Sequence, residues 1–95
     1  MTKYVCDFDS VRNAINILDN KIIKMRTDLK IYKQNISTEL SGWESLSKST
    51  FEEKNNNMID SINGNIEHLE QISNYLKTVV SKLESVESSL ASIKI

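Results

Sequence analysis

The chain has 95 residues, a net charge of −1, two glycines, no proline and 6% aromatic residues. This balance excludes a basic nucleic-acid binder, argues against an aromatic-rich β-sandwich, and leaves few residues that break a helix. The lone Cys6 cannot form an intramolecular disulfide, and one domain over residues 1–95 is the size expected.

The first clear pattern predicts a helix over about residues 9–41. Its apolar residues alternate in steps of four and three, which is the spacing of a heptad seam. Asp9 or Ser10 is the expected N-terminal cap. The seam consists of Val11, Ile15, Leu18, Ile22, Met25, Leu29, Tyr32 and Ile36.

A turn is expected around residues 42–48. Gly42 suits a left-handed C-terminal cap of the first helix. Ser41 and Glu44 have the spacing of a capping box that would start the next helix at once. A second box, formed by Ser49 and Glu52, would place the start after a longer loop, and the sequence leaves both starts open.

A second seam predicts a helix over about residues 49–93. It runs through Phe51, Asn55, Met58, Ile62, Asn65, Leu69, Ile72, Leu76, Val79, Leu83, Val86, Leu90 and Ile93. Three further residues, Ile59, Ile66 and Val80, widen this stripe beyond what one neighbouring helix covers. A break at Gly64 would give three helices, but the heptad spacing continues unshifted through it, which favours one long helix.

The fold class expected is therefore all-α, an antiparallel two-helix hairpin that completes a four-helix bundle with a partner. The second helix is longer than the first, so its end has no partner within the chain. The first helix also carries isoleucines outside its seam. The predicted partner interface consists of Ile17, Ile23, Ile31, Ile59, Ile66, Val80, Leu83, Val86, Leu90 and Ile93.

No arrangement of reactive side chains predicts catalysis, a metal site or a cofactor. His68 is the only histidine and lies on a predicted helix without a second ligand nearby. Glu67 and Glu70 share an exposed helix face, and a two-helix hairpin has no cleft to enclose them. We expect no enzyme activity and no small-molecule substrate. The sequence also shows no apolar stretch typical of a signal peptide or a transmembrane helix.

The turn resembles that of the WXG family, the early-secreted-antigen-like small proteins of type VII secretion. In that family a Trp-x-Gly motif lies between two antiparallel helices, and an aromatic residue often follows about eight positions later. Trp43 and Phe51 match this pattern, whereas Ser45 stands where the family has glycine and Gly42 precedes the tryptophan. The turn motif is therefore Gly42, Trp43, Ser45 and Phe51.

The resemblance is incomplete at the export signal. Many members of the family carry Tyr-x-x-x-Asp/Glu, and the small helical partners of LXG toxins carry Phe-x-x-x-Asp. In this chain Tyr75 is followed four residues later by Val79, and Phe51 is followed by Asn55. This departure implies that the chain travels with a partner that completes the signal, or that it uses a variant signal.

The resemblance implies a non-catalytic type VII secretion component. It would be a WXG-like partner, targeting factor or chaperone that binds the helical domain of a larger LXG-like effector or another WXG-like protein. It would be cytoplasmic before export and secreted without a cleaved signal peptide, touching membrane only through the secretion machinery. The alternatives are a self-dimerising secreted WXG-like protein, a cytoplasmic coiled-coil adaptor, and an immunity protein that masks a toxin.

Overall fold

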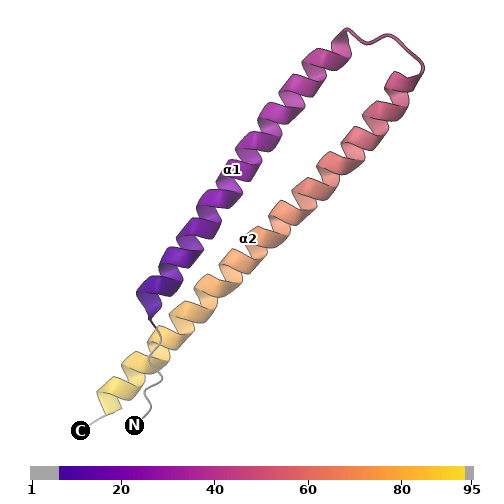
Figure 1. The fold of residues 1–95 in the computed structure, drawn as a ribbon. Helices are drawn as coiled ribbons and strands as arrows, with labels where there is room; N and C mark the ends of the chain where they lie inside the picture. Colours follow the sequence, from indigo (N-terminus) through magenta and orange to yellow (C-terminus); the bar gives the residue numbers. More distant parts are fainter. Residues whose placement is uncertain (1–6, 94–95) are drawn as a thin grey trace.

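The computed structural model describes the backbone of residues 7–93 and the side chains of residues 7–90. Over that range the chain forms two helices, α1 (Phe8–Ser41) and α2 (Ser47–Ile93). They lie antiparallel along their length, as a rod of 78 × 21 × 16 Å (Figure 1). The all-α hairpin predicted from the two heptad seams is confirmed.

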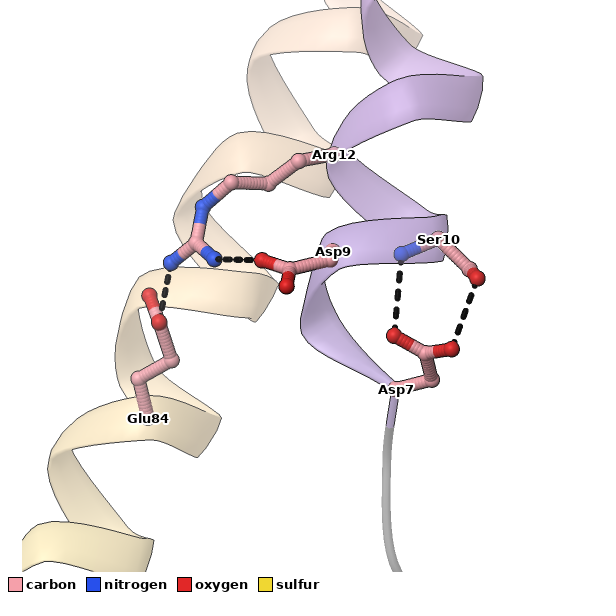
Figure 2. A network of polar contacts seen from close by, with 5 residues as sticks. All are labelled: Asp7, Asp9, Ser10, Arg12 and Glu84. Atoms are coloured by element: carbon pink, nitrogen blue, oxygen red, sulfur yellow. Dashed lines mark hydrogen bonds and ion pairs between the residues drawn. The ribbon is translucent and has the colours of Figure 1, made fainter.

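The first helix begins at Phe8, and its N-terminal cap lies two residues before Asp9 and three before Ser10, the two predicted caps. Asp7 is the N-cap, and its carboxylate accepts hydrogen bonds from the backbone N–H and the hydroxyl of Ser10, at 3.1 and 2.8 Å (Figure 2). These bonds satisfy an N–H group that the helix itself leaves free. They also lower the pKa of Asp7, with the Ser10 hydroxyl as the largest cause. The expectation that Asp9 or Ser10 caps α1 is therefore wrong.

The contact face of α1 is the predicted seam. Residues seven apart lie on one line along a helix, and the line of Ile15, Ile22 and Leu29 is buried. We call it the Ile15 line. The adjacent Leu18 line is mostly half-buried and consists of Val11, Leu18, Met25 and Tyr32. Its most exposed member is Met25, at 37%.

The contact face of α2 is rotated by one line from the predicted seam. Ile59, Ile66, Ser73 and Val80 form the Ile59 line, and all four are buried against α1. The neighbouring line belongs to the predicted seam, and we call it the Ile62 line. It contains Ile62, Leu69, Leu76, Leu83 and Leu90, and the first three of these are half-buried. A third line, the Met58 line, also belongs to the predicted seam but mostly faces outward. It consists of Phe51, Met58, Asn65, Ile72, Val79 and Val86.

This rotation corrects part of the predicted partner interface. Ile59, Ile66 and Val80 are only 7%, 1% and 6% exposed, so they belong to the hairpin's own core. Their predicted role as partner contacts is wrong, because α1 already covers them. Conversely, Met58 and Ile72 belong to the predicted seam and are 44% and 38% exposed.

The turn differs from the expected one in its backbone. Gly42 has φ −93°, so the left-handed cap predicted there is absent. The helix instead closes with hydrogen bonds from the N–H groups of Gly42 and Trp43 to the carbonyls of Glu39 and Leu40, at 3.3 and 3.1 Å. The second helix starts at Ser47, which neither predicted capping box places correctly.

The longer helix runs unbroken past both its glycine and the start of its neighbour. α2 has 47 residues against 34 in α1. Gly64 lies in its interior and on its exposed side, so the three-helix alternative is excluded. Beyond the first turn of α1, α2 continues without a helix beside it, as the difference in length predicts (Figure 1).

We predict that Gly64→Ala stabilises the hairpin. A Cβ added at Gly64 meets no atom within 4 Å, so alanine removes the glycine's backbone entropy without a clash. The free energy of unfolding, measured by urea denaturation followed by circular dichroism, should rise by about 0.5–1 kcal/mol. A decrease would show that the helix bends or breaks at this position.

Candidate partner-binding face

One side of the hairpin is joined by polar pairs that we call the polar ladder. Each rung lies seven residues further along α1 and seven residues back along α2, as antiparallel packing requires. The rungs are Arg12 with Glu84, Asp19 with Lys77, and Arg26 with Glu70. Arg12 also approaches Asp9 on its own helix, at 3.7 Å (Figure 2). All six ladder side chains are partly exposed, so each rung contributes at most about 1 kcal/mol.

The alternation of sign along the ladder specifies which residues of the two helices face each other. The middle rung is reversed, with the acid on α1 and the base on α2. A slip by one heptad would place Arg12 beside Lys77 and bring Asp19 beside Glu70. The opposite slip would place Asp19 beside Glu84. Like charges at these positions destabilise the slipped pairings, so the ladder contributes more to register than to stability.

Two polar residues lie inside the contact face. Ser73 is 1% exposed, and its hydroxyl donates to Oδ1 of Asp19 at 2.5 Å. Asn55 is 8% exposed, and its side-chain oxygen accepts a hydrogen bond from the hydroxyl of Tyr32. Each buried polar group has its partner on the other helix, so a shift in register would leave it unsatisfied.

The carboxylate of Asp19 accepts two of these contacts, and they change its pKa. The bond from the Ser73 hydroxyl, and secondly that from Lys77 Nζ at 2.9 Å, hold the pKa of Asp19 below its usual range. Both contacts favour the ionised carboxylate.

The opposite side of the hairpin is apolar. Here the Leu18 line of α1 meets the Ile62 line of α2, and the Met58 line extends the surface outward. We call these three lines together the apolar face. A groove of about 290 Å³ lies within it, lined by Met25, Asp28, Leu29, Tyr32, Met58 and Ile62. The face has the composition of a helix–helix contact surface, and no helix of the described part of the chain packs against it.

The apolar face continues onto the unaccompanied end of α2. Leu83 and Leu90 extend the Ile62 line, and Val86 extends the Met58 line. Leu83 is 45% exposed, Val86 is 54% exposed and Leu90 is 62% exposed. The structure therefore places three residues of the predicted partner interface on one continuous surface. The side chain of Ile93, predicted with them, lies outside the described residues.

The other predicted partner residues lie elsewhere. Ile17, Ile23 and Ile31 are exposed on the outer side of α1, away from the apolar face. Ile17 and Ile31 share a line, whereas Ile23 lies on a different one. These isoleucines are separated by charged and polar neighbours, so they do not form one surface with the residues of α2.

The predicted turn motif is only partly assembled. The rings of Trp43 and Phe51 pack in a tilted arrangement, with centroids 5.3 Å apart. Trp43 therefore covers the end of the Met58 line, to which Phe51 belongs. Ser45 does not join this contact; its hydroxyl lies 2.8 Å from that of Ser47 at the start of α2.

The chemistry of the described residues gives no other candidate site. His68 is exposed, and no group of three or more metal-binding side chains comes together within the described residues. Neither α1 nor α2, over the residues described, has a stretch long and apolar enough to cross a bilayer. Cys6 lies outside the described residues.

The total surface area is large for the mass of the chain. It is 7727 Å², whereas a compact monomer of 10.9 kDa exposes about 5,600 Å². The difference of about 2,100 Å² exceeds the area that one partner contributes to a protein–protein interface of standard size. The elongated hairpin with its exposed apolar residues is the form expected of a chain that packs against another protein or another copy.

Comparison of the chain with protein-family models, with curated protein sequences and with solved structures gives no match.

We predict that the ladder tolerates a charge swap but not a single reversal. Arg26→Glu removes one rung and adds repulsion with Glu70, so it should lower the free energy of unfolding by about 1 kcal/mol. The double variant with Glu70→Arg should recover most of the loss in urea denaturation. Lys30→Glu, which changes the same charge on the same helix, is the matched control. A double variant no more stable than Arg26→Glu would contradict the ladder.

We also predict an acid-dependent loss of stability that depends on Asp19. Because its folded-state pKa is lowered, its stabilisation is complete above the unfolded pKa of about 3.9 and is lost as the pH falls through the folded pKa. Asp19→Asn should therefore reduce the free energy of unfolding at neutral pH and cause no loss once the carboxyl is protonated. A loss of equal size at neutral and strongly acid pH would contradict this role.

Proposed function

We propose that this chain is a non-catalytic partner protein that packs its apolar face on the helical domain of a larger effector. In this proposal it acts as a targeting factor or chaperone in type VII secretion. It keeps the effector's apolar helices covered before export, and the two leave the cytoplasm as one four-helix unit.

The observation that carries the proposal is the apolar face. A hairpin buries one stripe of each helix, yet α2 presents two further apolar lines beside the buried one. The uncovered side chains include Met25, Met58 and Ile72, all more than one-third exposed. A second pair of helices is the simplest structure that covers a surface of this length and width.

The turn supports the type VII assignment. Two antiparallel helices joined at Gly42 and Trp43, with Trp43 packed on Phe51, resemble the WXG arrangement. There are two departures from it: Ser45 stands in place of glycine, and neither Tyr75 nor Phe51 is followed by an acidic residue four positions later. The departure at the signal positions favours a chain that relies on its partner for export over one that is exported alone.

The proposal predicts that covering the apolar face is required for export of the effector. In a host lacking the gene, the wild-type chain should restore secretion of the partner effector, measured by immunoblot of the medium. A variant with Ile72→Asp and Val86→Asp should fail, because two buried charges would oppose the contact. It should also fail to co-purify with the effector's N-terminal helical segment.

The matched control carries Gln71→Asp and Ser85→Asp, which place the same charges on neighbouring positions away from the apolar face. Circular dichroism should show both variants to be equally helical. Full secretion with the apolar-face variant, or binding only to the effector's C-terminal domain, would refute the proposal.

A further inference from the structure

We infer that the partner of the apolar face is a different helical protein, one whose contact surface is bordered by acidic side chains. This inference rests on the proposed docking role of the face. It goes beyond that role because it excludes a second copy of this chain as the preferred occupant and specifies the partner's charge.

The border of the apolar face on α2 is basic. The line next to the Met58 line contains Lys54, His68 and Lys82, spaced fourteen residues apart, with Ser61 and Tyr75 between them. All five residues are exposed. A partner that covers the Met58 line must therefore approach two lysines and a histidine.

The acidic residues of α2 lie on other sides of the helix. Asp60 and Glu67 lie beyond the polar ladder, and Glu70 and Glu84 form its rungs. Among the described residues of α2, the border line carries no carboxylate. The net charge of −1 for the chain therefore conceals a local excess of basic residues on this border of the apolar face.

The border on α1 carries one base and one acid. The line beyond the Leu18 line contains Ala14, Lys21, Asp28 and Asn35. Asp28 is already paired with Lys24, whose Nζ lies 2.7 Å from its carboxylate. Lys21 and Asp28 together give this border no net charge, so the excess of positive charge beside the apolar face lies on α2.

A second copy of this chain and a different helical protein could both cover the apolar face and bury a similar apolar area. Charge complementarity decides between these two occupants. A second copy has no acidic border to set against the basic border of α2, because its own α2 border is basic and its α1 border carries no net charge. A partner with acidic borders would place opposite charges there. Rim charges of this kind govern partner choice and the rate of association more than total affinity.

The experiment uses the chain itself to make an acid-bordered probe. The double variant with Lys54→Glu and Lys82→Glu keeps the apolar face and reverses its border on α2. Sedimentation equilibrium of the wild type, the variant and their mixture measures the three dissociation constants. At low salt we expect the mixed complex to form with a Kd on the order of tenfold lower than that of wild-type self-association.

Salt and a matched variant provide the controls. At about 0.5 M salt the preference for the mixed complex should largely disappear, because exposed charges are then screened. The variant with Lys30→Glu and Lys33→Glu has the same change in charge on the ladder side of α1, and it should show no such preference for the wild type.

The outcomes separate this inference from the proposed function. Wild-type self-association as tight as the mixed complex at low salt, or no mixed complex at all, overturns the inference.

A second pair of substitutions, Ile72→Asp with Val86→Asp in the wild-type member of the mixture, tests whether the apolar face is the contact. If the mixed complex persists unchanged, the apolar face is not the contact, and the proposed function fails as well. If these substitutions abolish association but the border charges have no effect, only the inference about charge fails.

Discussion

A pair of helices can bury only one stripe of each, and this constraint governs the whole molecule. The hairpin satisfies it with the Ile15 line of α1 against the Ile59 line of α2. Everything apolar outside those two lines stays partly in contact with water. Because α2 has three adjacent apolar lines and α1 has two, most of the remainder collects on one side of the rod, with the outer isoleucines of α1 as the exception. The uncovered surface exists because the two helices carry more apolar side chains than a single helix–helix contact can bury.

Heptad spacing was sufficient to predict the two helices, their antiparallel arrangement and the contact face of α1. It was not sufficient for α2, because the lines that contain Met58, Ile62 and Ile59 are adjacent and all carry large apolar residues, so any adjacent two could form a seam. Ser73, a small polar residue within the buried line, made the true seam look weaker than the Met58 line. Hydrophobicity alone therefore could not determine the rotation of α2.

The information that determines this rotation is present in the charges. Arg12, Asp19 and Arg26 alternate in sign at heptad spacing on one side of the Ile15 line, and Glu70, Lys77 and Glu84 alternate in the complementary order beside the Ile59 line. Matching these two series places the Ile59 line in the contact. The caps were harder to predict because short polar residues are abundant near both helix starts. The turn geometry depends on how the helices meet, which local sequence does not specify.

The polar ladder and the apolar face lie on opposite sides of the same contact, so the hairpin has a defined direction of assembly. The ladder side is already occupied by ion pairs whose charges would lose hydration if another helix covered them. The apolar side loses little on being covered and gains from every side chain removed from water. A partner is therefore expected on one side only, and the resulting bundle closes after one hairpin has been added. The polar series that specifies the register of the two helices also leaves the three continuous apolar lines together on the opposite side of the hairpin.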